Sequence, residues 1–380
     1  MENIYYKRVV DDLIYERLDY IGAILIEGPK WCGKTTTSQQ HAKSVLKLQD
    51  PKNKVSNLEL ATIDPYILLE GEKPRLIDEW QIAPVLWDAV RTSVDDLNEV
   101  GLYLLTGSTS VDGSKIMHSG TGRIHRLLMR PMSLYESKES NGKISLINLF
   151  NNPNLDINRI KSDLSFKDLI FATCRGGWPS TLNIKSKKGQ LFIVKNYIDN
   201  ICNIDISTVD GVKRDPIKVK KILKSYSRNI STIASNKTIM KGVKEDKEYI
   251  SEPTFYSYVD ALKKLFVIDN VSSWNPNIRS STSIRTIEKK EFIDPSIAVA
   301  SLKLNMENLL YDLKTFGFIF ENLCIRDLKV YSSLMDGEVS YYRDRFDLEA
   351  DCVLHLEDGR YALIEFKVGT RNMMKVQKIY

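Results

Sequence analysis

The chain has no long apolar segment. No uninterrupted apolar run in its 380 residues approaches the roughly 18 residues that a membrane-spanning helix needs. The start, Met1-Glu2-Asn3, is not a basic region followed by an apolar stretch, as a secretory leader would be. These two absences exclude a helical membrane protein and predict a cytoplasmic protein with no membrane partner.

Paired cysteines are missing too. The five cysteines are scattered, form no C-x-x-C pair and have no histidine cluster beside them; they are Cys32, Cys174, Cys202, Cys324 and Cys352. Disulfide scaffolds and zinc sites depend on closely spaced ligands of these types. The cysteine pattern therefore excludes both and predicts a reducing compartment.

The chain also lacks a large net charge. Lysine and arginine number 54 against 49 aspartates and glutamates, a net charge of +5, and the hydrophobic fraction of 43% is ordinary for a folded chain. The charge is nevertheless uneven, because residues 213–247 hold eleven basic residues against three acids. Such a segment is typical of a surface that binds a polyanion such as DNA.

What the chain does contain is a complete phosphate-binding loop with the pattern G-x-x-x-x-G-K-T. It follows the apolar run Ala23–Ile26 and precedes a polar, helix-like segment. In such a loop the backbone N–H groups face the phosphates, Lys34 reaches the terminal phosphates, and the Thr35 hydroxyl can hold Mg²⁺ at a helix N-terminus. The predicted nucleoside triphosphate site comprises Gly28, Pro29, Lys30, Trp31, Cys32, Gly33, Lys34, Thr35 and Thr36.

Polar side chains end two further strand-like runs. The run Arg75–Ile77 leads into Asp78 and Glu79, and a third run leads into Thr106 and Ser108. Because parallel strands present their carboxyl ends at one edge of a sheet, these groups should converge on the phosphates. We expect Asp78 to bind the metal ion, Glu79 to polarise the attacking water, and Thr106 or Ser108 to sense the γ-phosphate.

An arginine follows the third run. Arg123 lies in a Gly-Thr-Gly-Arg segment. In oligomeric nucleotidases such an arginine stabilises charge in the transition state, in cis or from a neighbouring copy. Arg123 is thus a predicted catalytic residue, and a homo-oligomer is expected with it; an arginine that pairs with a surface acid is the alternative.

The middle of the chain has two helical patterns. Apolar residues at helical spacing between Val219 and Ile230 leave Lys218, Lys221 and Lys224 near the opposite face. A second helix is expected after Glu252, followed by a strand, with Arg279 and Arg285 beyond it. This order predicts a winged helix that contacts DNA. An internal lid or spacer is the alternative.

A hairpin is predicted near the end of the chain. With Glu357-Asp358-Gly359 as a three-residue loop and Gly359 in the left-handed conformation, Asp351 lies opposite Glu365 and one face is wholly apolar. Asp351, Glu365 and Lys367 then share the other face. Two carboxylates and a lysine can hold a divalent metal, orient water and stabilise the charge on a cleaved phosphodiester.

A fourth acid accompanies this hairpin. Glu321 interrupts the apolar stripe of a preceding helix, where a charge needs a partner or a metal ion. We therefore expect it beside Asp351 and Glu365, which are the predicted metal ligands. Two alternatives are a surface hairpin with ordinary ion pairs and a nuclease-like fold that does not cut.

These motifs together resemble the bacterial and archaeal AAA+-like ATPases that carry a C-terminal domain of unknown function. They are Gly28–Thr35, Leu76–Gln81, Leu104–Ser108, Gly122-Arg123, Gly176–Pro179 and Asp294–Ser296. The resemblance implies ATP as the nucleotide, and a PD-(D/E)xK nuclease-like end whose signature would be Asp351 and Glu365-Phe366-Lys367. No proline precedes Asp351, which weakens the expectation that this domain cuts. Only thirteen residues follow Lys367, so we expect the domain to be incomplete.

The sequence and the resemblance predict an α/β fold in three parts. They are an AAA+-like P-loop domain with a parallel sheet over 1–210, a winged-helix-like domain over 211–292 and an α/β restriction-endonuclease-like domain over 293–380. The predicted function is Mg²⁺-dependent binding and hydrolysis of ATP by a chain whose rear domains engage nucleic acid. The alternative is a nucleotide-dependent switch that binds a protein partner, with an inactive nuclease-like domain.

Overall fold

The computed structural model describes residues 4–110, 117–157, 159–245, 250–275, 287–344 and 348–368. Lys247 of the basic segment, and Arg279 and Arg285 of the predicted winged helix, lie outside these ranges. Within them, no helix combines the length and the apolar character that crossing a bilayer requires.

Contacts divide the chain into two compact units. The first is Met1–Pro131 with Lys264–Phe266, and the second is Met132–Lys263 with Val267–Tyr380. Both mix helices and strands, so the predicted α/β class is confirmed. The finer division into three domains stays a prediction.

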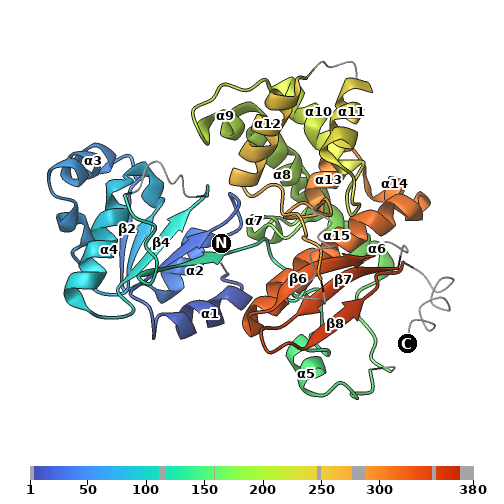
Figure 1. Cartoon of the computed structure of the whole chain (residues 1–380), viewed down its shortest axis with the longest axis horizontal. Helices are drawn as coiled ribbons and strands as arrows, with labels where there is room; N and C mark the ends of the chain where they lie inside the picture. Colours follow the sequence, from blue (N-terminus) through green and yellow to red (C-terminus); the bar gives the residue numbers. More distant parts are fainter. Residues whose placement is uncertain are drawn as a thin grey trace. The chain divides into compact units, whose positions relative to one another are not determined.

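The first unit is built on a five-stranded parallel sheet (Figure 1). Its strands are β1 (Ala23–Glu27), β2 (Ser44–Lys47), β3 (Arg75–Asp78), β4 (Tyr103–Gly107) and β5 (Ile124–Leu128), in the spatial order β2-β3-β4-β1-β5. The central strands β1 and β4 are buried almost throughout. They are accordingly continuous apolar runs, as expected of a parallel sheet that is covered on both faces.

Helices cover both faces of this sheet. They are α1 (Val9–Arg17), α2 (Lys34–His41), α3 (Lys54–Ile63) and α4 (Val85–Leu97), with 3₁₀ turns at Pro65–Leu69 and Trp80–Ile82. Residues of α1 pack on the face that carries Ile24 and Ile26. The opposite face carries Leu25 and packs against α4 and the Pro65–Leu69 turn. Since β1, β3 and β4 all run in one direction, their last residues meet at one edge.

The second unit is mainly helical and ends in a sheet. Its helices are α5 (Leu146–Asn151), α6 (Phe166–Arg175), α7 (Pro179–Leu182), α8 (Lys187–Asn200), α9 (Ile206–Thr208), α10 (Pro216–Ser227), α11 (Asn236–Glu245), α12 (Glu252–Lys264), α13 (Ser296–Ser301), α14 (Met306–Tyr311) and α15 (Leu313–Ser332). A π-helical turn at Ile201–Asp205 joins α8 to α9, and a 3₁₀ turn follows α15. The long helix α15 packs against the sheet (Figure 1).

The C-terminal sheet has the predicted hairpin and the predicted register. Its antiparallel strands are β6 (Glu338–Arg343), β7 (Glu349–His355) and β8 (Tyr361–Ile364), in that spatial order. Cys352 pairs with Ile364 and Leu354 with Ala362, and Gly359 has φ +87°. The prediction of a three-residue loop with a left-handed glycine is therefore confirmed; this register places the apolar residues of both strands on one face.

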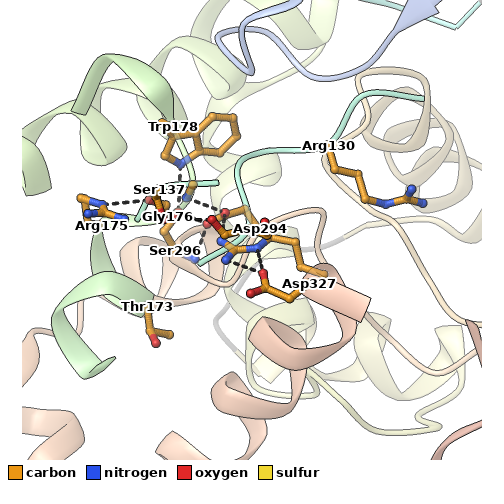
Figure 2. A network of polar contacts seen from close by, with 12 residues as sticks. Arg130, Ser137, Thr173, Arg175, Gly176, Trp178, Asp294, Ser296 and Asp327 are labelled. Atoms are coloured by element: carbon orange, nitrogen blue, oxygen red, sulfur yellow. Dashed lines mark hydrogen bonds and ion pairs between the residues drawn. The ribbon is translucent and has the colours of Figure 1, made fainter. Parts of the chain in front are cut away.

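A buried polar network explains two of the sequence motifs. The Asp294 carboxylate accepts hydrogen bonds from the Gly177 and Ser296 amides, and the Trp178 indole donates to the Ser296 hydroxyl (Figure 2). Arg326 on α15 donates to Asp294 at 2.8 Å and to Asp327. Buried charges persist only when they are paired and hydrogen-bonded, as all of these are. The motifs around Gly176 and Asp294 thus hold the second unit together.

Candidate nucleotide-binding site

The phosphate loop connects β1 to α2 in the first unit. Gly33, the residue before α2, has φ +102°, and Trp31 has φ +68°, so the loop contains two residues with positive φ just before the helix. Gly28 has φ +152°, and a Cβ atom there would lie 2.2 Å from the carbonyl oxygen of Met129. Only glycine fits this position. The loop therefore has the backbone geometry that turns amide N–H groups toward a phosphate.

Lys34 lies within the curve of the loop. Its side chain is buried, and its ammonium donates to the carbonyl oxygens of Gly28 at 2.9 Å and Pro29 at 2.8 Å. These carbonyls hold the Lys34 ammonium at the N-terminus of α2. The helix dipole favours an anion at the same place, so both the ammonium and the helix end attract a phosphate. Lys34 thus occupies the position from which an ammonium can reach bound phosphates.

Asp78 joins the loop to the neighbouring strands. Its Oδ1 atom accepts hydrogen bonds of 2.7 Å from the Thr35 hydroxyl, at the start of α2, and from the Thr106 hydroxyl, at the end of β4. Asp78 is 2% exposed. The three strand ends that the sequence predicted to converge therefore do so at this carboxylate.

Glu79 directly follows and has an uncommon backbone conformation. Its φ of +57° and ψ of +50° are left-handed, and its amide donates to the Thr106 hydroxyl at 3.0 Å. Its Oε2 atom accepts from the Ser108 hydroxyl at 3.1 Å and from the Gln81 amide. Non-glycine residues in this region are strained and are often found at functional sites. The strained backbone positions this carboxylate beside Asp78.

Arg123 lies elsewhere. The Ala23 amide, at the start of β1, donates to the carbonyl of Arg123, so this arginine is at the amino edge of the sheet, the edge opposite the loop. The five residues of β1 separate the edges by about 16 Å at 3.3 Å per residue. Its guanidinium pairs with Asp95 at 2.6 Å. The role of Arg123 in cis is therefore wrong, and a role in a neighbouring copy stays a prediction.

Arg8 belongs to the site and was not predicted. It lies just before α1, is 4% exposed, and donates to the carbonyl of the loop residue Cys32 and to the carbonyl of Arg130, both at 2.8 Å. Sequence reasoning missed it because its partners are 24 and 122 residues away. Gln81 is a second residue that was missed, although its place two residues after Glu79 was a local signal.

Replacing Arg8 by alanine is expected to lower kcat/KM for nucleotide hydrolysis by about 10-fold or more. The guanidinium fixes two carbonyls, and a hydrogen bond to a charged group contributes about 1.5–3 kcal/mol. Arg8→Lys should restore little, because a lysine lacks the planar fork that donates to both. Steady-state kinetics with separate kcat and KM values tests this, with Arg17→Ala at the other end of α1 as the control. Full activity of a folded Arg8→Ala protein would contradict the assignment.

The second predicted site lies in the second unit. Lys367 pairs with Glu365 at 2.7 Å and with Asp351 at 3.5 Å, and Glu321 lies on α15 as an ion pair of Lys289. The sequence predicted that Asp351, Glu365 and Lys367 lie close together, but it did not predict that Lys289 contacts Glu321. Among the described residues no three His, Cys, Asp or Glu side chains are placed to hold a metal ion.

A basic surface lies on α10 and α11. The two helices pack together, with Ile239 and Val243 of α11 buried and the Ser225 hydroxyl donating to the Ile239 carbonyl at 2.7 Å. On the exposed side α11 carries Lys237, Lys241 and Lys244. The lysines of α10 are half-buried or exposed. The exposed residues of α12 include two acids, Glu252 and Asp260, and two lysines, Lys263 and Lys264, so this helix has no excess of either charge there. Positive charge is thus concentrated on α10 and α11.

Residues 21–138 match the AAA domain family. Residues 166–308 and 316–379 match two families described only as domains of unknown function, DUF8612 and DUF4143. No curated protein matches the chain. The first match agrees with the parallel sheet and the phosphate loop. Residues 21–138 therefore form an AAA-type P-loop domain, which is the type of domain found in ATP-binding P-loop ATPases. The winged-helix and nuclease-like interpretations stay predictions.

Solved structures similar to the chain include the Walker-type ATPase PABY2304 of Pyrococcus abyssi, at 14% identity over 78% of this chain and 96% of that one, with a TM-score of 0.47. A STAND protein with a tetratricopeptide repeat sensor from Pyrococcus horikoshii is 14% identical over 88% of this chain and 49% of that one, with a TM-score of 0.27. The Drosophila ORC bound to DNA is 13% identical over 81% and 93%, with a TM-score of 0.23. These TM-scores are too low to establish a common fold over the aligned lengths.

Proposed function

We propose that the first unit hydrolyses ATP with Mg²⁺ and that the second unit binds nucleic acid. The observation that carries the first part is the convergence of Thr35 and Thr106 on the Asp78 carboxylate at one edge of the sheet, beside a loop whose Gly28 and Pro29 carbonyls hold Lys34. Lys34 binds the terminal phosphates, and the loop amides orient them. Thr106 holds Asp78 and the Glu79 amide in place, and Thr106 or Ser108 senses the γ-phosphate.

The oxygen atoms at this edge fit Mg²⁺. The Thr35 hydroxyl and the Asp78 carboxylate are hard oxygen donors 2.7 Å apart, the type of ligand that Mg²⁺ takes beside substrate phosphates. These two residues would hold the ion, which neutralises phosphate charge when bound. The Glu79 carboxylate accepts a proton from the attacking water, and Ser108 and Gln81 keep its Oε2 atom oriented.

The basic surface on α10 and α11 supports the second part of the proposal. DNA should raise the rate of ATP hydrolysis if the two units act together, and a rate unchanged by any single-stranded or duplex DNA or RNA contradicts this coupling. A protein partner that binds only in the presence of ATP would then favour the switch interpretation, in which the second unit is a docking surface.

Charge reversal of the α11 lysines tests the surface directly. The triple variant Lys237→Glu, Lys241→Glu, Lys244→Glu is expected to weaken duplex DNA binding and to reduce the slope of log K against log salt by about 3, since each lost phosphate contact contributes about 0.9. The matched control reverses three exposed lysines on or near α8, which are Lys185, Lys188 and Lys195. Fluorescence anisotropy from 50 to 200 mM salt measures both. Equal loss in the two triple variants would contradict a specific role for α11.

A further inference from the structure

Lys289 reaches the carboxylates of the second predicted site from a different part of the chain. It lies on a short antiparallel ladder opposite Val271, and it is 7% exposed. Its ammonium donates to Glu321 Oε1 and, at 2.9 Å, to the main-chain oxygen of Asp351. The Lys289 ammonium therefore lies between α15 and β7 and contacts an oxygen atom of each.

The remaining carboxylates of this cluster are also paired. Asp351 Oδ2 accepts from the Phe366 amide at 2.9 Å and lies 3.5 Å from the Lys367 ammonium, which also pairs with Glu365. Three carboxylates thus face two ammonium groups and one amide. In this cluster, each acid that the sequence predicted for metal binding or catalysis therefore has an ammonium partner from the chain itself.

A fourth carboxylate lies deeper beside Lys289. Glu291 is fully buried, and its Oε2 atom accepts from the Ser231 hydroxyl at 3.2 Å. Burial, and next the nearby Glu321, raise the pKa of Glu291 to about 8, so it is mostly neutral at pH 7. Burial works against the charge of Lys289, but the surrounding carboxylates, Glu321 first and then Glu291 and Asp351, together outweigh it and raise the pKa of the ammonium. The cluster is therefore close to charge balance without any added ion.

These residues do not fit a divalent metal ion. Mg²⁺ takes about six oxygen ligands at about 2.0–2.1 Å in octahedral geometry. Here Lys289 uses Glu321 Oε1 and the main-chain oxygen of Asp351, and Lys367 pairs with the carboxylates of Glu365 and Asp351. A divalent ion that took these oxygen atoms would have to displace the buried Lys289 ammonium from Glu321.

We propose that Lys289 is the built-in cation of this cluster and excludes a divalent metal from it. Where the second unit binds nucleic acid, a part of this inference that rests on the proposed function, it does so without cutting it, and the cluster joins the Val271 ladder to α15 and β7. This goes beyond the proposed function, because it concerns a site that the ATPase does not use. It also assigns the nuclease-like residues a structural role.

The experiment uses the full chain without nucleotide, so that the phosphate loop takes no metal with ATP. Mn²⁺ is the probe, titrated by calorimetry, and single-stranded and duplex DNA are incubated with Mg²⁺ or Mn²⁺. We expect that neither Mn²⁺ binding nor DNA cleavage by the wild-type chain depends on Asp351. Asp351→Ala should therefore give the same result as the wild type in both assays. Either signal, if lost in Asp351→Ala, overturns the proposal.

Two further measurements test Lys289 itself. Lys289→Ala should melt at a lower temperature than the wild type, and millimolar Mn²⁺ should raise that melting temperature while leaving the Lys289→Arg melting temperature unchanged. In the wild type, acetylation of Lys289 should be at least 10-fold slower than that of exposed Lys314 on α15, with or without Mn²⁺. This labelling remains informative if Lys289→Ala does not fold. Faster acetylation of Lys289 when Mn²⁺ is added would show displacement by the metal and would overturn the proposal.

Discussion

Replacing Lys34 by alanine is expected to weaken nucleotide binding by about 100-fold or more. The Lys34 ammonium is the buried cation of the loop, 2.9 and 2.8 Å from the Gly28 and Pro29 carbonyls. A hydrogen bond to a charged group contributes about 1.5–3 kcal/mol, and alanine removes both the bonds to phosphate and the positive charge. Equilibrium titration with a fluorescent ATP analogue measures the loss.

Lys43→Ala is the matched control for this experiment. Lys43 follows α2, is exposed and carries the same charge, so its loss changes net charge without touching the loop. Its affinity for the nucleotide should remain within about 2-fold of wild type, because exposed charges interact weakly in water. Unchanged affinity in Lys34→Ala would show that the phosphates bind elsewhere.

The elements that sequence reasoning predicted are those whose signal is local. The strands β1, β3 and β4 contain apolar runs that lead into polar residues, and the hairpin of β7 and β8 has the register that makes one whole face apolar. The strands β2 and β5 were not predicted. Both lie at the edges of the sheet, are short and contain charged or polar residues, so their pattern does not differ from that of a loop.

The site residues that were missed depend on contacts between distant parts of the chain. Lys289 meets Glu321 from 32 positions away and the Asp351 carbonyl from 62 away. The expectation that Glu321 needs a partner was sound, because a buried charge is costly, but burial alone cannot say whether the partner is a metal ion or a lysine. Only the fold decides that. The same holds for Arg8, which no motif marks.

Glu79→Gln is expected to stop hydrolysis while leaving nucleotide binding intact. The amide keeps the size of the carboxylate but cannot accept a proton, and general base catalysis contributes about 10²–10⁴-fold. Binding should persist, because Lys34, Thr35 and Asp78 keep their contacts. Single-turnover hydrolysis and equilibrium binding of ATP, measured on the same preparation, separate the two effects.

The control for this substitution is Glu72→Gln, an exposed glutamate that precedes β3. It should retain wild-type turnover. Equal loss of binding and turnover in Glu79→Gln would mean that the left-handed backbone at this position collapses and that the carboxylate supports the fold of the loop. Because Glu79→Gln should hold ATP without consuming it, the variant also separates the nucleotide-bound state from turnover. DNA affinity that changes when ATP binds to Glu79→Gln would therefore connect the two units by binding alone, whereas an affinity that ATP leaves unchanged would mean that any coupling requires hydrolysis.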